Sequence, residues 1–139
     1  HALGNVTHLN LTGCREIKNV SSLGRVHTLN LCNCSQVKDV SALGQVHTLI
    51  LKGCHQITDV SDLKKVHDLD ISFCYRVTDI SMLTSVHTLR CGGSEQFLAQ
   101  IGLADLDLDD RDGCYKKIRA SILASVRVFV FGGFKFVNY

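Results

Sequence analysis

The chain has 139 residues, of which 45% are hydrophobic and 20% charged, with no proline and a formal net charge of +2. This composition is typical of one soluble folded domain and excludes an intrinsically disordered chain. The near balance of charges gives no reason to expect nucleic acid or a membrane as partner, and no apolar run reaches the roughly eighteen residues of a membrane-spanning helix.

The sequence repeats with a period of twenty residues. Val26, Val46, Val66 and Val86 begin nearly identical units, and a count from Val6 leaves five residues before six periods and fourteen after them. We therefore predict one domain over residues 1–139, built from units at about 6–25, 26–45, 46–65, 66–85, 86–102 and 103–125 and a closing half-repeat at 126–139. The first five residues align with the end of a unit, so we expect the parent protein to extend upstream or this sequence to be processed or partial.

Each unit is predicted to contain one short strand and a tight return. In the unit that begins at Val46, the alternation Leu49-x-Leu51 is strand spacing, whereas the apolar residues after it step by three. About fourteen residues remain for the return after a strand of about five, which is too few for an ordinary α-helix with two turns. We therefore predict a 3₁₀ turn in each return, with Asp39 and Asp59 as capping residues.

This pattern resembles the leucine-rich repeat, L-x-x-L-x-L-x-x-N/C-x-L, which appears here as Val46-x-x-Leu49-x-Leu51-x-x-Cys54, with Ile57 one place late. It looks like the cysteine-containing subclass, although the unit is shorter and no F-box is present. It is also similar to arrays in giant DNA viruses of amoebae and some protists. The resemblance implies an α/β-type solenoid, with a curved parallel β-sheet on the concave face, short 3₁₀ or irregular returns on the convex face and little α-helix.

The repeat pattern slips after Leu89. The next strand is predicted at 103–108, three residues early, and the extra residues fall in an acidic segment at 109–112. The final strand keeps the frame but places Phe129, Phe131 and Phe134 at its central core positions. Since aromatic rings are large, we expect this closing half-repeat to cover the open end of the core.

Cysteines recur at one position of the unit, where parallel side chains oppose both disulfide formation and tetrahedral zinc binding. We predict structural thiols at Cys14, Cys34, Cys54 and Cys74. The odd total of seven cysteines and their core-like positions favour a reducing compartment, so we expect a cytoplasmic or virion-associated protein. Four N-x-[ST] sequons, which matter only in a secreted chain, argue against this expectation: Asn5, Asn10, Asn19 and Asn33.

A second set of repeated residues precedes each strand: His27, His47, His67 and His87. Imidazoles spaced by about 5 Å could bind a transition metal or act as a pH switch through mutual repulsion. We favour the alternative that each ring bonds a neighbouring backbone group.

The acidic segment lacks the spacing of a calcium loop. We therefore expect no metal and no cofactor, and the absence of P-loop, G-x-G-x-x-G, H-E-x-x-H and G-x-S-x-G motifs leads us to expect no enzyme.

The outward strand positions differ between units whose core positions hardly change. Such variation is typical of a recognition surface, although drift at unconstrained surface sites would look the same. We interpret the chain as a non-catalytic module that binds a protein partner, with an acidic centre suited to a basic patch on that partner. The predicted partner-binding residues are His67, Asp68, Asp70, His87, Arg90, Asp105, Asp107, Val128 and Val130.

A second interpretation is a structural assembly subunit, for example a virion-associated protein. The strand from Val126 to Phe131 is apolar on both faces. An exposed edge strand offers unpaired N–H and C=O groups to another chain. This alternative predicts a homodimer joined through terminal edge strands.

Overall fold

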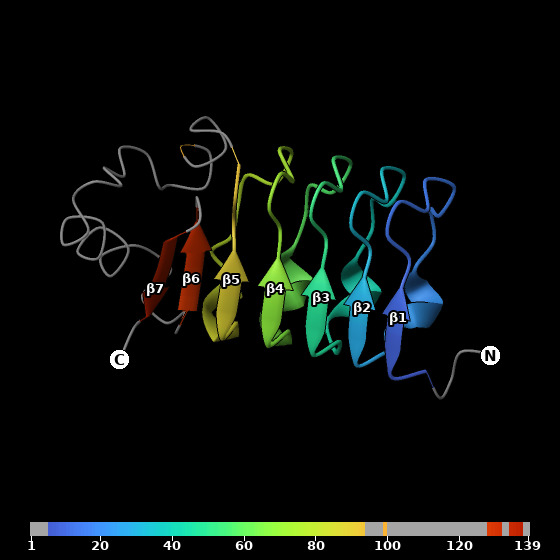
Figure 1. Ribbon diagram of the computed structural model, residues 1–139, viewed down its shortest axis with the longest axis horizontal. Coiled ribbons are helices and arrows are strands. Elements are labelled where there is room, and N and C mark those ends of the chain that lie inside the picture. Colours follow the sequence, from blue (N-terminus) through green and yellow to red (C-terminus); the bar gives the residue numbers. More distant parts are fainter. Residues whose placement is uncertain (1–5, 94–98, 100–127, 132–133, 138–139) are drawn as a thin grey trace.

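The computed structural model of the chain describes residues 6–93, 99, 128–131 and 134–137. Their strands form one sheet in sequence order (Figure 1): β1 (His8–Asn10), β2 (Thr28–Asn30), β3 (Thr48–Ile50), β4 (Asp68–Asp70), β5 (Thr88–Arg90), β6 (Val128–Phe131) and β7 (Phe134–Val137). Short 3₁₀ helices follow the first four: η1 (Ser21–Leu23), η2 (Ser41–Leu43), η3 (Ser61–Lys65) and η4 (Leu83–Ser85). Within these described ranges, no helix is long and apolar enough to cross a membrane.

The twenty-residue period of the sequence is the step between neighbouring strands. Leu9 pairs with Leu29, and the same register continues through Leu49, Leu69 and Leu89, all in parallel. Because strand side chains alternate between the two faces, this register places leucine behind leucine on one side of the sheet. The repeated sequence pattern therefore builds a repeated core.

The core runs continuously through the stacked units. Leu29, Leu49 and Leu69 are fully buried, and the other repeated apolar positions of these units are buried with them. Those positions are occupied by Leu31, Leu51, Ile71, Cys34, Cys54, Cys74, Val37, Ile57, Val77, Val40, Val60, Ile80, Leu43, Leu63 and Leu83. A unit alone would leave this apolar stripe in water, so stacking is what stabilises each unit.

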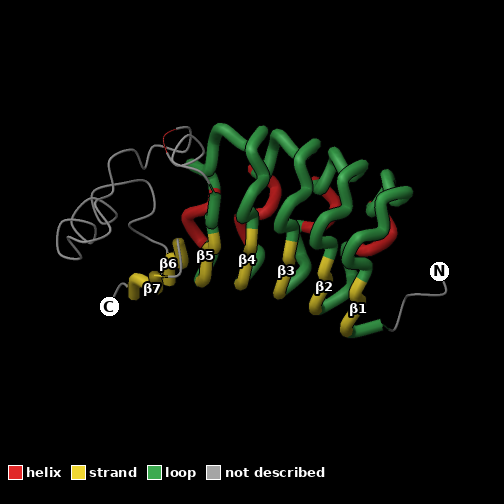
Figure 2. The backbone as a smooth tube through the Cα atoms, turned by 45° about the horizontal axis from the view of Figure 1, so that its top comes forward, coloured by secondary structure: helices red, strands yellow, loops and turns green. Residues whose placement is uncertain are grey.

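The return segments lie on the side of the solenoid opposite the strands. Figure 2 shows the strands along one side and the 3₁₀ helices behind them. The predicted architecture, a curved parallel sheet with 3₁₀ returns, is confirmed. Five-residue η3 is the longest of the four 3₁₀ helices, in agreement with the number of residues available in each return.

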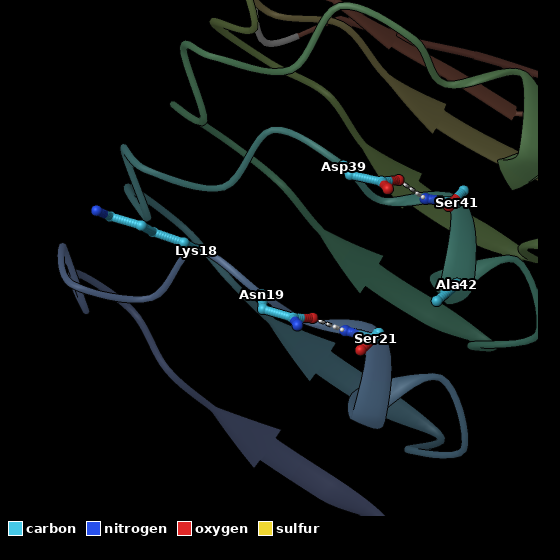
Figure 3. Close-up of a pocket in the computed structure, with 6 residues that line it drawn as sticks. All are labelled: Lys18, Asn19, Ser21, Asp39, Ser41 and Ala42. Carbon is cyan, nitrogen blue, oxygen red and sulfur yellow. Dashed lines mark hydrogen bonds between the residues drawn. The ribbon is translucent and has the colours of Figure 1, made fainter.

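Asp39, which we expected to cap η2, lies one residue further from this 3₁₀ helix than a capping residue does. The residue that precedes η2 is Val40, and it makes no side-chain capping bond. Instead Oδ1 of Asp39 accepts the backbone N–H of Ser41 at 2.9 Å, and Asn19 does the same for Ser21 (Figure 3). These bonds form a side-chain-closed turn that positions the start of the 3₁₀ helix.

The buried thiols form hydrogen bonds to the preceding unit. Sγ of Cys54 donates to the carbonyl of Leu31 at 3.0 Å, and Sγ of Cys74 donates to that of Leu51 at 3.1 Å. Cys34 makes the same bond to the preceding unit. Each of these carbonyls also accepts a backbone N–H from its own unit, for example that of Leu51 from Cys54, so the thiol is its second donor and links two units.

The C-terminal part of the sheet differs from the predicted single closing strand. β5 pairs with β6 in parallel, with Leu89 opposite Phe129, across twice the usual sequence distance. The strand predicted at 103–108 lies outside the described residues. β6 then pairs with β7 in antiparallel fashion, with Phe131 opposite Phe134. Two glycines stand between those phenylalanines in the sequence, which is a hairpin signal that the repeat frame concealed.

This hairpin also corrects the position of the C-terminal edge. The expectation placed an exposed edge at Val126 to Phe131, but β6 is paired on both sides, with β5 and with β7 (Figure 1). Of the strands that the structure describes, the last in the sheet is therefore β7.

Candidate binding surface on the concave face

The concave face consists of two columns of side chains that flank the buried leucines. The parallel register places Thr28, Thr48, Asp68 and Thr88 in the first column, and Asn30, Ile50, Asp70 and Arg90 in the second. The first column is partly or fully buried, whereas Arg90 is exposed. The two columns carry hydroxyl, amide, apolar, acidic and basic groups in different units above one leucine core.

A shallow hollow of about 280 Å³ lies on this face between β3 and β5. It is lined by Thr48, Leu49, Ile50, Asp68, Asp70 and Arg90. Three of the predicted partner-binding residues, Asp68, Asp70 and Arg90, are therefore brought together. They come from two neighbouring strands, and Asp70 is the register partner of Arg90.

The two aspartates of the hollow are held differently. Partial burial disfavours the ionised carboxylate of Asp68, but hydrogen bonds from Thr88 and His67, together with the charges of His67 and His47, lower its pKa below the usual value. Oδ1 of Asp70 accepts the backbone N–H of Ser72 at 2.9 Å. Asp68 is therefore ionised at neutral pH, and Asp70 is fixed by the turn at the end of its strand.

The repeated histidines form a continuous stack at the edge of this face. The ring centroids of His27 and His47 lie 4.6 Å apart, those of His47 and His67 also 4.6 Å, and those of His67 and His87 4.5 Å, with ring planes within 15° of parallel. Nδ1 of His47 lies 3.2 Å from Oγ1 of Thr48, and Nδ1 of His67 lies 3.4 Å from Oδ1 of Asp68. These two rings contact side chains of the strand rather than the backbone groups that we expected.

The other predicted partner-binding residues lie outside the hollow or outside the described part of the chain. His67 and His87 lie in the stack, beside the column that contains Asp68. Backbone register aligns Val128 with Thr88 and Val130 with Arg90, so β6 extends both columns. The predicted residues Asp105 and Asp107 lie outside the described part of the chain.

An exposed aromatic cluster, which the sequence analysis missed, lies in the loops after β3 and β4. The rings of His55 and Tyr75 are stacked with centroids 5.8 Å apart, and Phe73 meets Tyr75 edge to face at 6.1 Å. Nζ of Lys52 lies 5.6 Å from the centroid of the Phe73 ring. These loops therefore place exposed aromatic rings next to the ends of β3 and β4.

A sequence signal for this cluster exists at Phe73. The same position of the three preceding units has a positive φ and is occupied by Gly13, Asn33 and Gly53, residues that tolerate it. Phe73 adopts φ of 60° and is 38% exposed. A bulky side chain in the left-handed region is strained, and such strain is concentrated at functional sites.

Comparisons with known proteins support the fold. The sequence matches no protein-family model, and no curated protein is significantly similar to it. An internalin (inlF) from Listeria monocytogenes has a similar structure, with a TM-score of 0.51 and 18% identity over 94% of this chain and 49% of that one. Internalin C2 (inlC2) from the same bacterium gives a TM-score of 0.47 and 20% identity, over 93% of this chain and 64% of that one.

The likeness to inlF shows the fold alone, at this level of identity. Internalins are leucine-rich-repeat proteins, so the chain has the leucine-rich-repeat solenoid that its sequence predicts. The chain spans about half the length of that internalin.

Proposed function

We propose that the chain is a non-catalytic protein-interaction module whose concave face binds a protein partner that carries a basic patch. The observation that carries this proposal is the contrast between the two sides of the strands. Leucine recurs at the buried position of β2 to β5, while the outward columns change in polarity and charge from unit to unit. A constant frame with a varied surface is suited to recognition.

The acidic centre of the face determines the kind of partner. Asp68 and Asp70 project from one strand into a hollow that is open to solvent. Negative potential in a concavity accelerates association with a basic surface, and added salt screens this effect. The proposed surface comprises the hollow and its extensions: His67, Asp68, Asp70, His87, Arg90, Asp105, Asp107, Val128 and Val130.

The positions of cysteine and histidine in the units of β3 and β4 support a non-catalytic role. A cysteine nucleophile requires an ionised thiol near a base. Burial raises the pKa of Cys54 and that of Cys74 to about 12, and both thiols donate to backbone carbonyls in the core. The stacked imidazoles instead lie at the surface of the sheet.

The free thiols also support the proposed location in a reducing compartment. All six cysteines within the described residues are unpaired, and four of them are buried. The cysteine-containing subclass, the viral source and a cytoplasmic or virion-associated location remain predictions from the sequence.

The double variant Asp68→Thr/Asp70→Asn tests the proposed surface. It gives β4 the outward residues of β2, namely Thr28 and Asn30, and asparagine preserves the acceptor that holds the turn at the end of the strand. The measurement is quantitative affinity capture from extracts of the native source, in the presence of a metal chelator. We expect the wild-type chain to retain a basic partner and the variant to lose at least nine-tenths of it.

The matched control removes two charges from the opposite side of the solenoid. Asp39→Asn/Asp59→Asn keeps both return turns, as Asn19 does naturally, and changes the net charge by the same amount. Capture by this control should equal that of the wild type. Equal capture by the concave and convex variants would refute the proposed surface.

The sheet edge at β7 favours assembly as a second candidate function. β1 and β7 end the strand order, so among the described strands each has one neighbour. Strand edges pair readily with other chains. Capture of a second copy of this chain, unaffected by the concave substitutions, would support this alternative in place of the first.

A further inference from the structure

We propose that His47, His67 and Asp68 bind one divalent transition-metal ion of the zinc class at the edge of the concave face. Imidazole nitrogen and carboxylate oxygen are both common zinc ligands, and three protein ligands leave one position for water. His67 and Asp68 also belong to the proposed partner surface, but this inference does not depend on that function, since it can be tested with the metal alone.

The distances between the three side chains suit a common ion. One ligand atom from each residue lies within 4.8 Å of the other two. Nδ1 of His67 and Oδ1 of Asp68 are 3.4 Å apart. Ligands bound tetrahedrally at zinc distances are separated by about 3.4 Å, so this pair already has the spacing of two zinc ligands.

The stacking of the histidines supplies the third ligand. The rings of His47 and His67 lie 4.6 Å apart with planes 11° from parallel, which places their nitrogens side by side. Both residues are exposed, and Nδ1 of His47 lies beside the hydroxyl of Thr48. Binding a common ion requires the His47 ring to turn within the stack, so that its nitrogen approaches the other two ligand atoms.

The register explains why the site belongs to this unit. The column position of Asp68 is occupied by Thr28, Thr48 and Thr88 in the neighbouring strands. Histidines stack along four units, but among these four only the unit of β4 adds a carboxylate beside the rings. The sequence pattern alone offered four equivalent histidines, and the structure distinguishes one pair of them.

Isothermal titration of the full chain with zinc chloride tests the site. Asp68→Thr is the informative variant, because it restores the residue that the neighbouring units carry and so preserves the fold. We expect one zinc ion per wild-type chain and at least a tenfold weaker affinity for Asp68→Thr and for His67→Gln. His27→Gln, in the same stack but distant from Asp68, should bind as tightly as the wild type.

Three results would overturn the proposal. The first is a wild-type chain that binds no zinc. The second is unchanged affinity in Asp68→Thr, which would assign binding to the imidazole stack alone. The third is an equal loss in His27→Gln and His67→Gln. Circular dichroism melting of each variant, expected within a few degrees of the wild type without metal, ensures that a lost fold is not mistaken for a lost ligand.

Discussion

Replacing Leu51 with alanine is expected to lower the free energy of unfolding by about 3 kcal/mol. Leu51 is fully buried in the third unit, with core residues of the units on both sides. Removing its isobutyl group loses apolar burial and leaves a cavity that a solenoid cannot fill without shifting two neighbouring units. Urea unfolding followed by circular dichroism measures the loss.

Ile50 supplies the control for this substitution. It neighbours Leu51 in the chain but lies on the concave face and is only partly buried. Ile50→Asn copies the residue at Asn30 and should change stability by less than about 1 kcal/mol. Similar losses from both substitutions would mean that the two faces of the strands are not divided between core and surface as described.

The free energy of unfolding is expected to fall by about 2.5 kcal/mol between pH 8.5 and pH 10, because two buried thiols resist ionisation in the folded chain. Burial raises the pKa of Cys54 and of Cys74 from 9.0 to about 12. Above pH 9 the thiols of the unfolded chain ionise while those of the folded chain stay protonated. The stabilisation is therefore complete below pH 9 and is lost as the pH rises towards 12. The pKa of Cys34 and that of Cys91 are raised in the same direction and add to the effect.

The double variant Cys54→Ser/Cys74→Ser separates thiol ionisation from other alkaline effects. Serine hydroxyls can still donate to the carbonyls of Leu31 and Leu51, but they do not ionise in this range. The variant starts from a lower stability, so the informative quantity is the slope of stability against pH. An alkaline slope as steep as that of the wild type would show that these thiols do not cause it.

The sheet and its returns could be predicted because both follow from the period. Identical residues twenty positions apart must occupy identical places in a stack, and a slip of one residue would turn Leu29 and Leu49 towards water. The 3₁₀ returns follow from the small number of residues between strands. The meeting of Asp68, Asp70 and Arg90 is a consequence of the same register.

Other features depend on what interrupts the period. The β6–β7 hairpin reverses the chain at a point where the spacing of Phe129, Phe131 and Phe134 still follows the repeat frame. The left-handed backbone of Phe73 is set by its neighbours, against its own preference. The contact of His67 with Asp68 depends on side-chain rotamers, which sequence spacing does not specify.

Site-specific photo-crosslinking tests the central claim, that the concave face binds the partner, most directly. A benzophenone amino acid at position 50 lies in the concave hollow, and one at position 42 lies in η2 on the opposite side (Figures 2 and 3). We expect irradiation of the captured complex to join the partner to the chain from position 50 and not from position 42. Crosslinking from position 42 alone would contradict it.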